Sequence, residues 1–253
     1  MLSKFWSDLT LDEIKKNGKN KVLIFPFSSI EQHGSHLPSG TDKMILDGIL
    51  SLLVNQNTKS NNFLIMPNLS MGSAGEHLNF EGTISAYSTK YIDYVISIIE
   101  NLCEKKYKKF LFLNSHGGQI SHLDIIAKEL KSKFEFIDIV KAHYFLFDGY
   151  EKIISKKELS FGYHGGEFET SIMMFLYPNL VKYKKISSNL ISPDYKSKNI
   201  ISYEKTIKRA WNTQDISKSG IIGDPTKANQ EKGKKILKIA VNNIIKIINE
   251  MTN

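Results

Sequence analysis

Hydrophobic and polar positions along this chain predict repeated strand-then-helix units. Short apolar and β-branched runs, typical of buried strands, occupy residues 22–27, 63–66, 109–113 and 134–140. Stretches with an apolar residue every three or four positions predict helices at residues 44–53, 89–106, 120–133 and 227–250. Such alternation favours a mainly parallel sheet between helical layers, with its active site at the carboxyl ends of the strands.

Four further stretches complete this prediction. Residues 70–86 have no clear period and many turn residues, so we expect a loop that shapes a pocket. Residues 143–161 show no clear pattern either, and we expect a mobile flap there. A helix is expected from Gly166 to Pro178, and residues 182–203 are expected to form excursion loops.

Composition is that of one enzyme-sized domain. With 253 residues, 41% of them hydrophobic, the chain can bury a substantial core, and no linker-like stretch divides residues 1–253. The single cysteine, Cys103, rules out an intrachain disulfide framework. No signal-peptide pattern and no long apolar run is found, so we expect a cytoplasmic protein that does not span a membrane.

The net charge of +8 raises the question of nucleic-acid binding. Every basic residue except Arg209 is a lysine, and the lysines are scattered along the chain. Arginine is the residue that clamps phosphates and reads bases bidentately, so its near absence argues against a nucleic-acid partner. A moderate preference for anionic substrates stays open.

Chemistry concentrates first in residues 25–42, where the strand at 22–27 runs into a loop rich in small residues. Glu31 and His33 are two positions apart, so an extended backbone directs both side chains to the same face. Asp42 can join them only if the loop doubles back. Two carboxylates and an imidazole suit zinc, manganese or iron(II) better than calcium. The alternative is a polar surface loop whose histidines bind no metal.

Two other segments repeat this composition. His116 lies in the turn Asn-Ser-His-Gly-Gly-Gln that follows the strand at 109–113. His164 opens the stretch His-Gly-Gly-Glu-Phe-Glu-Thr-Ser, which precedes an apolar run. Three separate segments therefore deliver histidine and carboxylate groups to loops beside core elements.

These three segments resemble the signature of the creatininase (creatinine amidohydrolase) family. The matching pieces are Glu-Gln-His-Gly-Ser-His-Leu-Pro at 31–38 with Asp42, the His-Gly-Gly turn at 116–118, and His-Gly-Gly-Glu-Phe-Glu-Thr at 164–170. Residues 75–84 and 220–225 resemble the family too, so the likeness spans residues 22 to about 233 in the family's order. It implies a three-layer α/β/α sandwich, a metal-dependent amidohydrolase and a homo-oligomer, often a hexamer.

The resemblance also implies roles for single residues. Glu31, His33, Asp42 and His116 match the metal ligands, with Asp42 bridging two divalent ions (zinc, manganese or iron), and Glu169 is either a further ligand or a base. His164, with Glu167 or Glu169 beside it, is expected to pass a proton to the leaving nitrogen. Glu76 and His77 are expected to line the substrate pocket. For His36 we expect a supporting hydrogen bond, and the structural alternatives are a histidine held in a turn for His164 and a helix-terminal carboxylate for Glu169.

The chain departs from relatives that act on creatinine itself. They carry a glutamate where this chain has Gly118 and an aromatic residue where it has Gly117. They also close tryptophans over the ring, whereas Trp6 and Trp211 lie outside the matching segments. We therefore expect metal-assisted hydrolysis of another carbon–nitrogen bond: a cyclic amide, a formamide on a heterocycle or a small peptide-like amide. The alternative is a non-catalytic descendant that binds a ligand or a partner.

Overall fold

The computed structural model describes residues 3–56, 62–162, 164–188, 201–203 and 207–253. Its main sheet has four parallel strands in the order β2-β1-β3-β4. These are β1 (Val22–Phe27), β2 (Phe63–Ile65), β3 (Lys109–Asn114) and β4 (Asp138–His143). A separate two-stranded sheet pairs β5 (Ile201–Ser202) with β6 (Ile207–Lys208).

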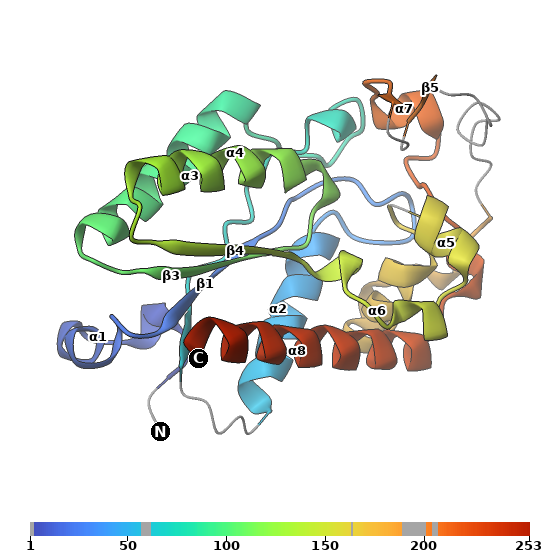
Figure 1. Cartoon of the computed structure of the whole chain (residues 1–253). Helices are drawn as coiled ribbons and strands as arrows, with labels where there is room; N and C mark the ends of the chain where they lie inside the picture. Colours follow the sequence, from blue (N-terminus) through green and yellow to red (C-terminus); the bar gives the residue numbers. More distant parts are fainter. Residues whose placement is uncertain (1–2, 57–61, 163, 189–200, 204–206) are drawn as a thin grey trace.

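Helices cover both faces of the main sheet, with α3 and α4 on one side and α2, α6 and α8 on the other (Figure 1). The described helices are α1 (Leu11–Asn17), α2 (Thr41–Asn55), α3 (Ser88–Glu104), α4 (Ile120–Lys133), α5 (Lys156–Phe161), α6 (Glu167–Leu176), α7 (Thr213–Ile216) and α8 (Gln230–Thr252). The predicted three-layer α/β/α arrangement with a mainly parallel sheet is therefore confirmed.

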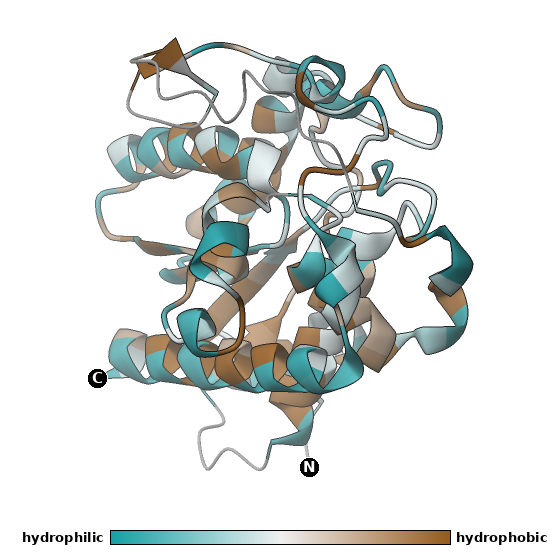
Figure 2. Cartoon of the chain, turned by 90° about the vertical axis from the view of Figure 1, so that its right-hand side faces the viewer, coloured by the Kyte–Doolittle hydropathy of each residue, from teal (hydrophilic) through white to brown (hydrophobic). Residues whose placement is uncertain are grey.

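Alternation along the central strands builds two apolar layers. On β1, Leu23 and Phe25 pack toward α3 and α4, whereas Val22 and Ile24 pack toward α2, α6 and α8. A strand buried on both faces reads as a continuous apolar run, which is why its position is clear in the sequence. The long helix α8 is amphipathic instead, with brown apolar positions interspersed with teal polar ones (Figure 2).

The prediction of a strand at residues 134–140 is wrong in position, because β4 runs from Asp138 to His143. Phe134 and Ile137 instead close a turn, in which the Ile137 N–H donates to the Phe134 carbonyl (3.2 Å). β4 lies at the edge of the sheet, so half of its side chains are polar and its sequence lacks the buried-strand signal.

Residues 143–161, expected to form a flap, contain three short helical turns: Tyr144–Leu146, Tyr150–Lys152 and α5. Buried tyrosines anchor this stretch, since the Tyr150 hydroxyl donates to the carbonyl of Tyr144 (2.8 Å). Most of the predicted excursion loop at 182–203 lies outside the described residues. Among the residues that are described, none of the helices is both long and apolar enough to cross a membrane.

Helices α6 and α8 are held closely together, which fixes the segment that follows His164. Gly233 of α8 leaves no room for a Cβ atom against the backbone of Ser171 and Ile172 in α6. Beside it, the Lys232 ammonium forms an ion pair with the buried carboxylate of Glu167 at the start of α6. The first turn of α6 is thereby set against the carboxyl end of the main sheet.

Candidate metal centre

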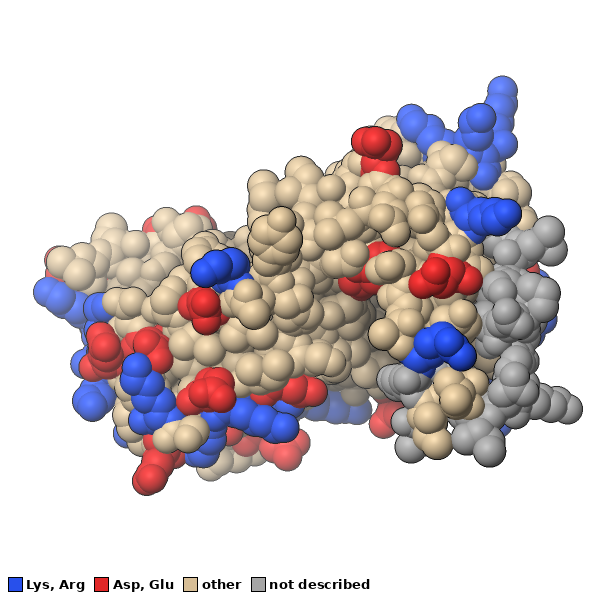
Figure 3. Space-filling view, turned by 90° about the horizontal axis from the view of Figure 1, so that it is seen from above, with Lys and Arg blue, Asp and Glu red and all other residues tan. Residues whose placement is uncertain are grey.

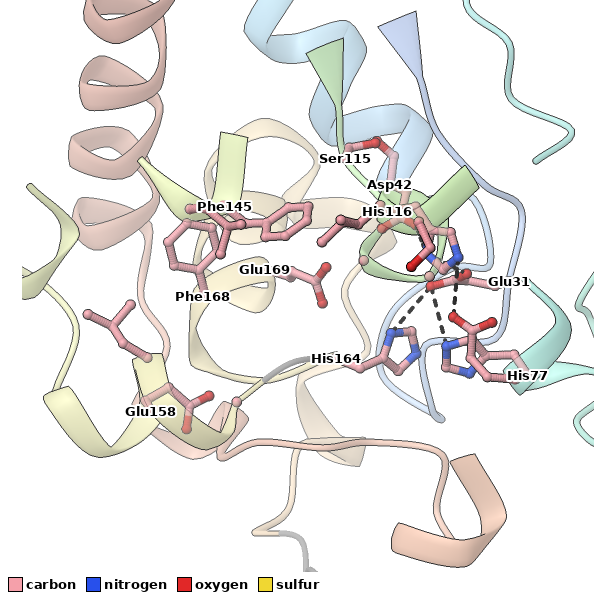
Figure 4. A pocket seen from close by; sticks show the side chains of 18 of the residues that line it. Glu31, Asp42, His77, Ser115, His116, Phe145, Glu158, His164, Phe168 and Glu169 are labelled. Carbon is pink, nitrogen blue, oxygen red and sulfur yellow. Dashed lines mark hydrogen bonds and ion pairs between the residues drawn. The ribbon is translucent and has the colours of Figure 1, made fainter. Parts of the chain in front are cut away.

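The polar cluster lies where β1 and β3 end. Glu31 and His33 follow β1, Asp42 lies in the first turn of α2, and His116 follows β3. Figure 4 shows Glu31, Asp42 and His116 close together. The loop between β1 and α2 doubles back as the sequence requires, because the N–H of Glu31 donates to the carbonyl of Ser39 (2.9 Å). All four side chains are buried.

Asp42 lies between the two histidines. Its Oδ1 is 3.4 Å from His33 Nε2, and its Oδ2 is 3.4 Å from His116 Nδ1. His116 Nδ1 also lies 3.0 Å from Glu31 Oε2, and the Ser29 hydroxyl donates to that same oxygen (2.9 Å). Each carboxylate oxygen of Asp42 therefore faces a different group of potential ligands.

Glu169 reaches the same cluster from the first turn of α6. Its Oε2 lies 3.8 Å from His33 Nε2 and accepts the N–H of Gly165 (2.6 Å). The carboxylate thus holds the turn that follows His164, as a structural carboxylate at a helix terminus would. It also faces His33, as a metal ligand would.

Burial and mutual charge perturb these groups strongly. Burial alone would lower the pKa of His33, but the nearby carboxylates of Asp42 and Glu169 raise it well above its usual value. For His116, burial likewise opposes the effect of Glu31 and Asp42, which raise its pKa. Burial also raises the pKa of Glu31 to about 7, whereas His116 and His33 overcome burial and hold the pKa of Asp42 well below its usual range.

The donors fit divalent cations. Glu31, Asp42 and His116 form one group of side chains whose ligand atoms all lie within 4.8 Å of one another, and His33, His164 and Glu169 form another. The His33 Nε2 atom is buried and has no hydrogen-bond partner, although carboxylate oxygens lie near it. Clustering buried carboxylates is costly unless a cation compensates them. Mixed imidazole and carboxylate donors suit zinc or manganese.

Glu76 and His77 lie at this cluster on the helical turn Gly75–His77. His77 Nε2 is 3.6 Å from Glu31 Oε1, and Glu76 Oε1 is 3.4 Å from His116 Nε2. His164 Nδ1 lies 3.4 Å from Glu31 Oε1. The structure therefore brings Glu76, His77 and His164 to the predicted centre.

Two residues singled out in the sequence lie apart from it. Glu167 is buried at the start of α6, but its carboxylate pairs with Lys232 and is not part of the pocket wall. Glu167 therefore has no contact with the pocket through which it could take part in catalysis. His36 donates to or accepts from the Thr170 hydroxyl through Nε2 (2.8 Å), which is the supporting contact expected for it.

A cavity of about 580 Å³ opens beside the cluster. Figure 4 shows His77, His116, His164 and Glu31 gathered on one side, and Phe145, Phe168 and Glu158 on the other, with Glu169 between. Its described wall contains no lysine or arginine. On the molecular face in Figure 3, basic side chains are separated by neutral and acidic ones and form no continuous band.

Sequence reasoning missed part of this pocket. Trp211 lines it although it lies outside the matching segments, and Phe145 and Phe168 form its apolar wall. Glu158 of α5 was also missed: its carboxylate accepts the N–H groups of Glu167 (2.8 Å) and Asp224 (3.2 Å) and so joins three segments. Trp211, Phe145 and Glu158 come from stretches without a motif or a regular pattern. Phe168 lies inside the matching segment 164–170, where an apolar side chain gives no sign of a place in the pocket wall.

Comparisons with known proteins find related hydrolases. The chain is 25% identical over 223 residues to the mycofactocin precursor peptide peptidase of Mycolicibacterium smegmatis, with 87% of this chain and 81% of the relative covered. It is 25% identical to the creatinine amidohydrolase of Pseudomonas putida, with 90% and 89% covered.

The fold is also that of solved creatininases. A mutant creatininase described as Zn-Zn type superposes with a TM-score of 0.76 at 24% identity, covering 99% of this chain and 98% of the other. The sequence profile of the family, described as creatinine amidohydrolase, matches residues 7–248. This protein is therefore a member of the creatininase family of hydrolases.

Proposed function

We propose that this chain is a metal-dependent amidohydrolase that cleaves a carbon–nitrogen bond in a small, uncharged or cationic amide. The observation that carries the proposal is the position of Asp42, whose two oxygens face His33 and His116 at equal distances of 3.4 Å. A carboxylate between two histidines, with Glu31 and Glu169 at either end, is suited to bridge two divalent ions.

Glu31, Asp42 and His116 would hold one ion, and His33, Asp42 and Glu169 the other. Bound zinc or manganese ions supply an activated water and polarise the amide carbonyl. Glu169 thereby takes the place of the carboxylate that position 118 lacks. Support for this comes from the distance of 3.8 Å between Glu169 Oε2 and His33 Nε2, the same nitrogen that Asp42 Oδ1 approaches.

His164 is the residue proposed to move the proton to the leaving nitrogen. It is buried, lines the pocket, and directs Nδ1 to within 3.4 Å of Glu31 Oε1. Burial, together with the charge of His33, lowers the pKa of His164 to about 4, so in the metal-free chain its imidazole is neutral at pH 7. A neutral imidazole at a metal-bound reaction centre is able to accept a proton and pass it on.

The pocket narrows the substrate class. Two carboxylates of its wall, those of Glu76 and Glu158, are not assigned to an ion, and the described wall has no cationic side chain to pair with an anion. The anionic preference left open by the net charge therefore finds no support. The aromatic wall of Phe145 and Phe168 favours an apolar group on the side of the pocket away from the proposed ions.

The test is hydrolysis by metal-free protein supplied with zinc or manganese. Since relatives include a precursor-peptide peptidase and a creatinine amidohydrolase, the panel contains short peptide amides with an apolar residue, cyclic amides and heterocyclic formamides, each with an anionic counterpart. We expect metal-dependent release of amine from a neutral or cationic member. His164→Ala should retain the metal and lose about 10²- to 10⁴-fold in kcat. Hydrolysis only of anionic members, or activity that survives chelation, would contradict the proposal.

A further inference from the structure

Gln32 lies between two proposed metal ligands in the sequence, Glu31 and His33, but its side chain contacts other residues. It is buried, and its amide reaches His77, His164 and the backbone of Gly220, three segments far apart in the chain. Gly220 belongs to the late stretch at 220–225 that the sequence singled out without a role. The side chain and the backbone carbonyl of this one residue therefore contact two histidines of the pocket.

Backbone groups fix the orientation of the amide. The N–H of Gly34 donates to Gln32 Oε1 (2.8 Å), so this atom is the acceptor and Nε2 is the donor. Nε2 in turn donates to the carbonyl of Gly220 (2.8 Å). Both glycines have a positive φ, 65° and 82°, and a Cβ on Gly220 would collide with the Gln32 amide. The surrounding backbone therefore accepts the amide in one orientation, with Oε1 toward Gly34 and Nε2 toward Gly220.

The hydrogen-bond partners of His164 are compatible with one neutral tautomer of its imidazole ring. Its Nε2 lies 2.6 Å from the backbone carbonyl of Gln32, and a carbonyl only accepts, so the proton must be on Nε2. The Gln32 amide nitrogen, 3.1 Å from the same Nε2, then has no lone pair to donate to and must direct its second hydrogen elsewhere. In the neutral ring His164 Nδ1 is left without a proton, facing Glu31.

His77 receives that second hydrogen. Its Nδ1 lies 3.0 Å from Gln32 Nε2, so Nδ1 accepts and the proton of the neutral ring is on Nε2, directed at Glu31 Oε1. The Thr213 hydroxyl, 2.9 Å from the same Nδ1, is able to donate or accept and follows whichever form the amide imposes. The two histidines thus approach one oxygen of Glu31 in opposite roles.

We propose that Gln32 is a positioning residue that holds both His77 and His164 in the Nε2–H tautomer, so that His77 donates toward Glu31 while His164 presents a free Nδ1 to the pocket. Its catalytic consequence rests on the proposed function, in which His164 moves the proton. Because Nδ1 of His77 accepts a hydrogen bond from the Gln32 amide, that ring carries no second proton and is neutral.

The tautomers are measurable without any substrate. Nitrogen-15 NMR of histidine-labelled protein distinguishes Nδ1–H from Nε2–H, and single His77→Gln and His164→Gln variants assign the two signals. We expect the Nε2–H form for both rings in chelator-treated wild-type protein. An Nδ1–H form at either ring would overturn the proposal, whatever the variants do.

Gln32→Glu replaces the donating nitrogen with an oxygen that accepts. We expect His77 to change to the Nδ1–H form, His164 to keep its proton on Nε2, and kcat to fall about 10- to 100-fold with KM within about twofold. The matched control is Gln119→Glu, at a fully buried amide that donates to Ser28 instead, where the His77 tautomer should stay unchanged. An unchanged His77 signal in Gln32→Glu would overturn the assignment.

If wild-type protein hydrolysed none of the amides, the proposed function would be wrong. The tautomer assignment would be unaffected, because nitrogen-15 NMR measures the tautomers without any substrate. The two failures are therefore distinguishable.

Discussion

The carboxylate of Glu76 fills the space beside Gly118 that any larger residue there would need. An ideal Cβ at position 118 would collide with Glu76 Oε1 and lie 2.6 Å from His116 Nε2. Glu76 Oε1 itself lies 3.4 Å from that nitrogen, on the side of the imidazole opposite Glu31. The glycine at 118 is thus what allows Glu76 to reach His116, and we infer that Glu76 orients this ring for the metal.

Gly118→Ala should therefore weaken the metal centre. The methyl group would displace Glu76, and loss of such an outer partner typically costs about 10- to 100-fold in metal affinity or activity. Competition with a chromophoric zinc chelator measures the affinity. The matched control is Gly117→Ala, because a Cβ there has nothing within 4 Å. Equal zinc affinities for the two variants would show that Glu76 does not act through His116.

The buried pair between Lys232 and Glu167 predicts a stability effect rather than a catalytic one. Lys232→Met would leave a carboxylate that is 2% exposed without its partner. We expect a loss of about 2 to 3 kcal/mol in the free energy of unfolding, somewhat below the cost for a wholly buried pair because the lysine side chain is 28% exposed. Urea denaturation measures this.

Lys235→Met, on the exposed face of the same helix, is the control and should change the free energy of unfolding by less than about 0.5 kcal/mol. Equal losses in the two variants would mean that the ion pair does not fix α6 against α8.

Metal binding should release protons and weaken as the pH falls. Nearby carboxylates raise the pKa of His33 and His116 above their usual value, so both rings carry an extra proton at pH 7 in the metal-free chain. A ligating imidazole must lose that proton, and each released proton makes the apparent Kd rise by about tenfold per unit fall in pH. Zinc titration calorimetry in buffers of different ionisation enthalpy counts the protons. A count of zero would contradict these assignments.

Much of the fold was predictable because its central strands are buried on both faces. The strand at 22–27 and the helix at 120–133 agree with the structure residue for residue. The edge strand β4 was misplaced, since its exposed positions dilute the apolar signal. Short helical turns within 143–161 were missed because their buried tyrosines follow no period.

The candidate site was predictable where chemistry concentrates in motifs. Glu31, His33, Asp42 and His116 stand in recognisable segments, and the structure brings them together. Contacts that depend on the tertiary fold were not visible, since nothing in the sequence pairs Gln32 with Gly220 or Glu167 with Lys232. The expected homo-oligomer stays a prediction, as does the count of ions.

The number of metal ions bound per chain distinguishes a two-ion centre from a cluster that holds no metal. Protein purified without chelators or a metal-binding tag is analysed for zinc, manganese and iron, before and after reconstitution, beside the Asp42→Asn variant. We expect two equivalents per chain in the wild type, and loss of bound metal in Asp42→Asn with its circular dichroism spectrum unchanged. A wild-type chain that holds no metal even after reconstitution would show that Asp42 does not join two ions.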